Sequence, residues 1–332
     1  MRRRGLSLLL VACGLALTVA LLVVARPAEI LALAGRSRLG GVLAGAGCAA
    51  GILLARGLRL ASLTVSRLSS GRAVAVVAVS QVATAVLPLR LGDVATVGLL
   101  HLSGVGGPAR SLSVALALRL LDALTLLVFC CAVLPWLGFP IAAPLALLGA
   151  LALALALVVA LGDRALRRLA STRAGAGPRR RRVLRSMLRA RRELRDTLRA
   201  PRRVAAATAF SFVAWGGVWL QTSALLGAMA LRWPPDHVLV GVLGASLGAS
   251  LPLNSVGSFG SMEAGWVAAL AALGHDPAVA LRAGFATHLW SVVFTVVFGA
   301  VAVGFLAASQ PGSRRRIWRA WRSAERNTSP GP

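Results

Sequence analysis

The chain has 332 residues, of which 57% are hydrophobic, and several of its apolar runs exceed the roughly 18 residues that a helix needs to cross a bilayer. This composition excludes a soluble globular protein. The formal net charge of +27 would favour nucleic-acid binding in a soluble protein. Here the basic residues gather at the ends of apolar runs, where charge reports membrane orientation, so no nucleic-acid partner is expected.

The apolar runs predict helices along the whole chain, and the expected fold class is an all-α polytopic membrane protein. In chain order the runs cover residues 6–25, 39–55, 73–89, 111–134, 141–162, 204–231, 236–251, 262–273 and 278–308. The first run follows Arg2 to Arg4 and could pass for a signal peptide. It is long, and no convincing small-residue cleavage site follows it, so we interpret it as a retained first span.

The Arg-rich segments indicate which parts of the chain face the cytoplasm. They are Arg2 to Arg4, the stretch with Arg56, Arg59, Arg67 and Arg72, the loop 163–203, and the tail from Arg314 to Arg322. If every apolar run before the basic loop crossed once, that loop would lie outside the cell. The conflict disappears if residues 73–103 form a re-entrant hairpin. A second re-entrant hairpin over residues 236–273 resolves the same conflict later in the chain.

Each predicted hairpin contains a break in its apolar pattern. The first break runs from Leu87 to Asp93 and the second from Leu251 to Glu263, and each combines Leu-Pro-Leu with Gly and a carboxylate. Non-helical backbone at membrane depth must be buried in protein or line a watery cavity. Transporters built from inverted repeats place their sites at such broken elements, so two facing breaks would define a central cavity.

The predicted topology has about six full transmembrane spans plus two re-entrant helical hairpins in an inverted repeat, with both termini in the cytoplasm. The first repeat covers about residues 1–134 and the second about 141–308, within a single integral membrane domain over 1–309. The basic loop 163–203 and the basic tail 310–332 are expected to be cytoplasmic. Lys and Tyr are absent, a bias typical of GC-rich bacterial genomes, so the expected location is the bacterial cytoplasmic membrane.

Residues 179–200 predict a basic amphipathic helix. Its apolar face holds Val183, Met187, Ala190, Leu194 and Leu198. Such a helix suits the surface of an anionic leaflet, as does the tail with Trp318 and Trp321. Topology determination and solvation explain both segments more simply than specific headgroup recognition does.

Glycines recur at four-residue spacing in two of the apolar runs. The pairs are Gly41/Gly45, Gly47/Gly51 and Gly244/Gly248. This spacing permits close contact between helices, although Gly and Ala are abundant throughout the chain.

Ionisable side chains inside apolar segments are costly and mark functional or paired positions. They are Arg90, Asp93, His101, Arg119, Asp122, Glu263, Arg282 and His288. Arg119 and Asp122 are one helical turn apart and can form an i, i+3 pair. Asp93 can cap the second arm of its hairpin or neutralise Arg90. A lone histidine in an apolar setting is more often a packed, hydrogen-bonded residue than a titrating one.

Glu263 is the strongest functional candidate. It is the only acidic residue between positions 236 and 276, and it follows Gly257 and Gly260 at the start of an apolar arm. The sequence carries no H-E-x-x-H helix, P-loop or G-x-S-x-G motif. The cysteines lie inside apolar runs without metal-site spacing, so neither a metal nor a cofactor is expected.

Three motifs carry a resemblance to a known family. They are Pro88, Arg90, Gly92 and Asp93 in the first break, Arg119 and Asp122 in an Arg-Leu-Leu-Asp element, and Pro252, Gly257, Gly260 and Glu263 in the second break. These motifs resemble the flippase-like membrane domain of lysylphosphatidylglycerol synthases, which also occurs as stand-alone bacterial membrane proteins. The resemblance covers nearly the whole chain. Two positions depart from it: Leu118 stands where Glu is common, and His288 stands where Arg is frequent.

The resemblance implies translocation of a phospholipid or lipid-linked headgroup between leaflets, through a cavity lined by the two hairpins. The expected translocation site comprises Arg90, Asp93, Arg119, Asp122, Glu263, Arg282 and His288. The arginines at 90, 119 and 282 would contact a lipid phosphate, while Asp93 and Glu263 position polar groups or balance charge. Aminoacyl transfer in that family needs a separate soluble domain after the membrane part, so no synthase activity is expected here.

Two other classes of function stay open. A membrane enzyme acting on a lipid-linked sugar or phosphate would use Asp93 and Glu263 as acid and base, which requires both carboxylates to converge on one cavity. A non-catalytic scaffold would recruit partners or anionic lipid through the basic loop and tail. The expected partners are a membrane phospholipid or lipid-linked substrate and anionic headgroups, and a homo-oligomer is left open.

Overall fold

The computed structural model describes residues 2–64, 68–87, 91–138, 188–250 apart from 198, and 259–309, with isolated positions between 140 and 149. Throughout these ranges the regular structure is helical. Several sequence predictions fall outside the described residues. They are the span 141–162, most of the loop 163–203, the tail 310–332, and the break residues Pro88, Arg90, Pro252 and Gly257.

Proline marks the start of many of the helices. In chain order the described helices are α1 (Arg2–Ala25), α2 (Pro27–Gly35), α3 (Leu39–Thr64), α4 (Ser70–Val86), α5 (Leu91–Leu102), α6 (Pro108–Val133), the short 3-10 helix η1 (Pro135–Leu137), α9 (Pro201–Ala228), α10 (Pro235–Ser250), α11 (Ser261–Ala271) and α12 (Pro277–Ala308). Proline is favoured at the first helical position because its missing N–H would have no partner there. At α12 the Asp276 carboxylate adds a cap, since it accepts hydrogen bonds from the backbone N–H groups of Ala278 and Val279.

The described chain contains four helices that are long and apolar enough to cross a membrane. They are α3, α6, α9 and α12, with 26, 26, 28 and 32 residues. α1 and α2 are bent by 69° at Arg26, a non-glycine residue with a φ of 55°, and make a fifth span if the pair crosses as one. The chain is therefore a multi-pass membrane protein. The predicted continuous first span ends where expected, at Ala25, and a second short helix follows it.

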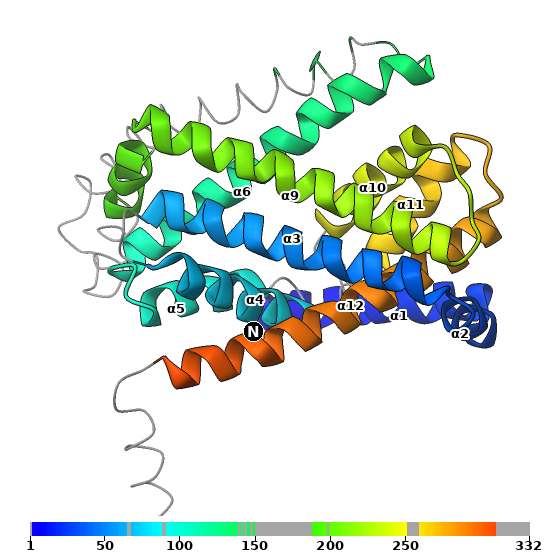
Figure 1. The fold of residues 1–332 in the computed structure, drawn as a ribbon, viewed down its shortest axis with the longest axis horizontal. Coiled ribbons are helices and arrows are strands. Elements are labelled where there is room, and N and C mark those ends of the chain that lie inside the picture. The colour runs from blue at the N-terminus through cyan, green and yellow to red at the C-terminus, as the bar shows by residue number, and fades with distance from the viewer. Residues whose placement is uncertain are drawn as a thin grey trace, which may run out of the picture.

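The same order of elements occurs twice in the described chain. A long helix, two short helices and a long helix follow one another as α3 to α6, and again as α9 to α12. Figure 1 shows α3 and α9, the first helix of each set, lying side by side at the centre of the molecule. They run antiparallel, because Gly41 near the start of α3 lies against Ala228 at the end of α9, while Ile52 lies against Gly217.

Each pair of short helices forms an antiparallel hairpin with close backbone contact. In the second hairpin, a Cβ on Gly244 of α10 would lie 2.4 Å from the carbonyl oxygen of Gly265 on α11, and one on Gly248 would lie 2.0 Å from that of Ser261. In the first hairpin, a Cβ on Gly92 of α5 would lie 2.3 Å from the Cα of Thr84 on α4. Only glycine allows these approaches.

The glycine predictions are confirmed in two of the three pairs. Gly244 and Gly248 face α11, and Gly41 and Gly45 face α9. The third pair, Gly47 and Gly51, is wrong, because nothing lies within 4 Å of a Cβ at either position. The spacing alone could not separate a helix face that meets another helix from one that does not.

One correction to the predicted topology concerns the end of α3. The apolar pattern predicts that this span ends near residue 55 and that Arg56 and Arg59 lie in a cytoplasmic basic segment. The helix in fact continues to Thr64, and Arg59 is only 5% exposed. Both arginines therefore lie in the protein interior, where helices on other parts of the chain provide their partners.

Part of the predicted basic amphipathic segment is described, and residues 188–197 are helical in the structure. Two residues of its predicted apolar face contact protein: Ala190 is buried, and Leu194 packs against a cluster that contains Leu63, Ala117 and Ala207. Arg110 of α6 forms an ion pair with Glu193 at 3.5 Å. Ala190 and Leu194 therefore contact other helices of the protein, and the predicted contact of this segment with an anionic leaflet stays a prediction.

Candidate functional site

A cavity of about 520 Å³ lies where the two hairpins meet the long helices. Its lining includes Leu87 at the end of α4 and Ser250 at the end of α10, so the broken end of each hairpin reaches it. Two adjoining cavities, of about 510 and 350 Å³, share Arg56, Thr84 and Arg119 with the first. The three cavities therefore adjoin around these shared side chains in the interior of the helical assembly.

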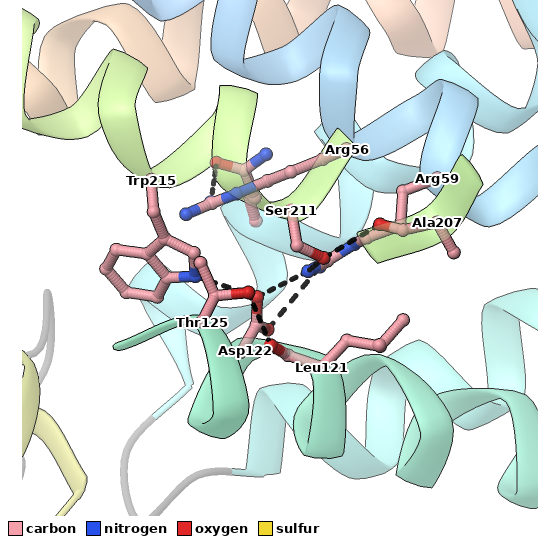
Figure 2. A network of polar contacts seen from close by, with 9 residues as sticks. Arg56, Arg59, Leu121, Asp122, Thr125, Ala207, Ser211 and Trp215 are labelled. Atoms are coloured by element: carbon pink, nitrogen blue, oxygen red, sulfur yellow. Dashed lines mark hydrogen bonds and ion pairs between the residues drawn. The ribbon is translucent and has the colours of Figure 1, made fainter. Parts of the chain in front are cut away.

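One wall of the cavity is built on a buried ion pair between α3 and α6, shown in Figure 2. Both terminal nitrogens of Arg59 reach the Asp122 carboxylate, and one of them also donates to Ser211 Oγ at 3.1 Å. The indole N–H of Trp215 donates to Asp122 Oδ1 at 3.0 Å. Because Ser211 and Trp215 belong to α9, the cluster joins three long helices through hydrogen bonds to charged groups.

The predicted i, i+3 pair between Arg119 and Asp122 does not form. Asp122 bonds to Arg59 instead, and Arg119 forms an ion pair with Asp93 on α5. Each of these two side chains thus pairs with a residue on another helix. The expectation that Asp93 neutralises Arg90 lies outside the described residues, and the structure gives Asp93 a different cation.

Arg56 lies one turn before Arg59 on α3 and has a different environment. Its guanidinium lies 5.8 Å from the Trp215 ring centroid, a cation–π distance, and donates to the Gln81 side chain at 3.3 Å. Within the described residues it makes no ion pair with a carboxylate, and it lines all three cavities. Figure 2 shows the Arg56 side chain next to Trp215, which is bonded to Asp122. Arg56 is therefore a half-buried cation with no carboxylate among its described direct contacts.

The second hairpin places Glu263 at the opposite part of the cavity, with an exposed fraction of only 1%. Its Oε1 lies 2.5 Å from Nδ1 of His288 on α12, and its Oε2 accepts a hydrogen bond from the backbone N–H of Gly260 at 2.7 Å. Gly260 has a φ of 104°, and a Cβ there would lie 2.6 Å from Thr18 Oγ1 of α1. Glycine is required at this position both by the backbone and by the close approach of α1.

The two acid–base pairs occupy equivalent positions in the two sets of helices. Asp93 is the third residue of α5, and Glu263 is the third residue of α11. Their partners, Arg119 and His288, are each the twelfth residue of the long helix that follows, counted from its initial proline. All four side chains line the same cavity. The repeated order of helices therefore extends to the polar residues that they carry.

Two of the candidate residues lie elsewhere. Arg282 forms an ion pair with Glu29 of α2, whose other oxygen bonds to Arg26 at 3.0 Å, and Arg282 is not among the residues that line the three cavities. His101 is exposed, and its Nδ1 lies 2.8 Å from the carbonyl oxygen of Gly106. Asp93, Arg119, Asp122, Glu263 and His288 are thus brought together, whereas Arg282 and His101 are not.

Sequence reasoning missed Arg56, Arg59, Gln81 and Trp215. A signal for the arginines was present, because the apolar pattern continues past them through Leu60 to Leu63 and keeps both inside one helix. Two arginines one turn apart inside an apolar helix are better explained by an internal site than by a loop. No comparable signal marks Trp215, because tryptophan is common in membrane helices.

The repeated helices and the interior cavity define the class: a polytopic helical membrane protein with a polar site between two sets of helices. The model of the family described as "Lysylphosphatidylglycerol synthase TM region" matches residues 9–299. The chain belongs to this family of membrane regions, as its motifs predicted. No curated protein and no solved structure matches the chain.

Proposed function

We propose that this protein translocates an anionic phospholipid or a lipid-linked phosphate headgroup across the bacterial cytoplasmic membrane. The observation that carries the proposal is the set of adjoining cavities around Arg56 and Arg119. A cation in the membrane interior is costly and needs a partner, and a phosphate would supply one to Arg56. Family membership supports a lipid-related role for the membrane region.

The walls of the cavity suit an amphipathic substrate. Leu126, Val242 and Met262 line it beside the charged groups, so apolar and polar surfaces lie next to one another. A headgroup phosphate at Arg56 would leave acyl chains against apolar side chains or in the surrounding lipid. The volume of about 520 Å³ is in the range that holds small-molecule groups and is too small for a whole phospholipid with both chains.

The proposal includes a topology of about six spans and two re-entrant hairpins, entered from opposite sides of the membrane. The antiparallel arrangement of α3 and α9 supports it, because equivalent helices of two inverted repeats run in opposite directions. In Figure 1 the first hairpin, α4 and α5, and the second, α10 and α11, lie toward opposite ends of the long axis. Both termini would then be cytoplasmic, with a sixth span in residues 141–162.

The alternative of a membrane enzyme meets one requirement, because Asp93 and Glu263 line the same cavity, but it has less support than translocation. Acid–base chemistry at Asp93 and Glu263 would require the two carboxylates to act on one group. Asp93 is paired with Arg119 and Glu263 with His288, so each carboxylate already has its own partner. A scaffold role would not require charged groups to be buried around a cavity.

The test is a proteoliposome assay with a fluorescent phosphatidylglycerol whose outer-leaflet label is chemically bleached. The wild-type protein should make the inner-leaflet label accessible, and Arg56→Gln should lower the rate at least about tenfold, because a hydrogen bond to a charged group is worth about 1.5–3 kcal/mol. Arg36→Gln is the matched control, since Arg36 is an exposed arginine outside the cavity lining. Equal rates for Arg56→Gln and wild type would contradict the site, and no lipid movement in the wild type would contradict the function.

A further inference from the structure

The His288–Glu263 pair differs from its counterpart, Arg119–Asp93, in one chemical respect. An arginine keeps its charge at any physiological pH, whereas an imidazole gains or loses a proton in that range. The two side chains of the histidine pair are also better shielded, at 9% and 1% exposed against 58% and 37% for the arginine pair. The repeat thus places a fixed ion pair on one side of the cavity and a pair that can change its charge on the other.

The hydrogen bonds of Glu263 determine where a proton can be added. Its Oε2 accepts from the Gly260 N–H, and a proton must lie between Oε1 and His288 Nδ1, which are 2.5 Å apart. A further proton therefore binds at Nε2 of His288. Without that proton the pair has a net charge of −1, and with it the pair is a neutral imidazolium–carboxylate pair.

The charge of the described part of the site follows from the side chains that line the three cavities. Among the described residues the charged ones are Arg56, Arg59, Arg119, Asp93, Asp122 and Glu263, and His288 is the titratable one. With a neutral His288 the three arginines and three carboxylates cancel. With a protonated His288 the site carries one positive charge. A phosphodiester headgroup carries one negative charge, so one added proton compensates one bound headgroup.

We infer that the His288–Glu263 pair is a proton-binding site, and that an anionic phosphodiester headgroup in the same cavity is bound and carried together with one proton. The inference rests on the proposed function and adds a coupling ion to it. The proton and the headgroup carry opposite charges in one cavity, and the proton is held by a pair that is shielded from water, so each stabilises the binding of the other.

Few other charged groups face His288 from the elements packed against α12. α11 brings Glu263, and α3 brings Arg56, which lines two cavities together with His288. α2 brings Glu29, which is neutralised by Arg282. Two elements carry their charged groups farther along: Arg72 on α4 follows Gly71, which lies against Phe305, and Arg202 and Arg203 are in the first turn of α9. On α1 the described titratable side chain is Cys13, which is exposed. The proton therefore responds mainly to Glu263, to Arg56 and to whatever anion the cavity holds.

The linkage fixes the direction of the pH dependence. A headgroup that binds together with a proton binds most tightly at low pH, where protons are more abundant, and loses affinity as the pH rises. Because one proton is involved, the dissociation constant rises by at most about tenfold per pH unit. The same linkage requires the protein to take up protons when the lipid is added.

The experiment measures both quantities on the full-length protein in detergent. Short-chain phosphatidylglycerol is added in weak buffer, its binding is measured by calorimetry, and proton uptake is measured with a pH-sensitive dye. Phosphatidylcholine, which has no net charge, is the lipid control. The wild type should take up as much as about one proton per bound phosphatidylglycerol, and its dissociation constant should rise with pH. His101→Gln, which removes an exposed histidine outside the cavities, should behave as the wild type.

His288→Arg gives the site a fixed pair like Arg119–Asp93, so it should bind phosphatidylglycerol without proton uptake and with an affinity that pH does not change. Binding by the wild type without proton uptake would overturn the inference and leave the proposed function intact. Proton uptake that persists in His288→Arg would also overturn it, since another group would then be the proton site. Failure of the wild type to bind the lipid would overturn the proposed function together with the inference.

Discussion

Arg59 shows how a charged residue can be placed inside a membrane protein at the scale of single residues. Its guanidinium is buried with Asp122, and Ser211 and Trp215 supply further hydrogen bonds. An ion pair of this kind gains little over a well-packed apolar pair, but removal of one partner leaves an uncompensated charge. The pair therefore sets the position of α3 against α6 and α9 more than it adds to stability.

Arg59→Met should destabilise the protein by about 3 kcal/mol, because Asp122 then keeps its charge in a shielded site without its partner. The double variant with Met at position 59 and Asp122→Leu should regain most of that loss. Thermal unfolding in detergent measures both effects. Arg110→Gln removes a more exposed pair with Glu193 and should cost less than about 1 kcal/mol. A double variant no more stable than Arg59→Met would show that the charge imbalance is not the cause.

At the same scale, the sequence identified Asp93, Arg119, Asp122, Glu263 and His288 as candidates because charge inside an apolar run is rare. It could not identify their partners. Asp122 and Arg119 are neighbours on one helix, yet each bonds to a residue on another helix. Partner choice depends on how the helices pack, which no local pattern encodes.

At the scale of elements, the hairpins depend on glycine at the contact between their two arms. The contact in the second hairpin is mutual, because a Cβ on Gly265 would lie 2.2 Å from the carbonyl oxygen of Gly244. The neighbouring atoms are backbone, so they can yield only if the two helices move apart. Such a movement would also shift Glu263, which lies in the first turn of α11.

Gly265→Ala should therefore destabilise the protein by about 1–3 kcal/mol, the usual cost of an extra methyl group in a tightly packed contact. Gly216→Ala is the matched control in a helix, because nothing lies within 4 Å of a Cβ there, and it should be neutral or slightly stabilising. Thermal unfolding of the two variants side by side checks the difference. If both variants unfold at the wild-type temperature, α10 and α11 are not held in close contact.

The sequence predicted two hairpins from their Pro/Gly breaks and from the position of the basic loop. The structure has a pair of short helices at each place, and re-entry into the membrane stays a prediction. It could not predict the bend between α1 and α2, because the apolar pattern runs on to Ala25 and the chain turns at an arginine with a positive φ. The predicted end of α3 near residue 55 is also too early, because charged residues inside this apolar run belong to the helix and not to a loop. In this protein the arginines at the end of that apolar run face a cavity.

At the scale of the whole molecule, two sets of helices in the same order enclose one polar site. Equivalent positions in each set carry an acid–base pair, and the pairs face the same cavity. In the proposed function, the headgroup would cross at this site, between the two sets of helices. In that function it crosses through this cavity and through no other surface of the protein.

The most direct test of this claim is to block the cavity. In a cysteine-free background, Ser246→Cys places a thiol on the α10 wall of the cavity, and Val303→Cys places one on an exposed position of α12 outside it. Both proteins are reacted with a bulky anionic thiol reagent, the extent of labelling is measured by mass spectrometry, and lipid movement is assayed in proteoliposomes. Labelling at Ser246→Cys should abolish lipid movement, while labelling at Val303→Cys should leave it unchanged. Full labelling of Ser246→Cys with undiminished lipid movement would contradict the account.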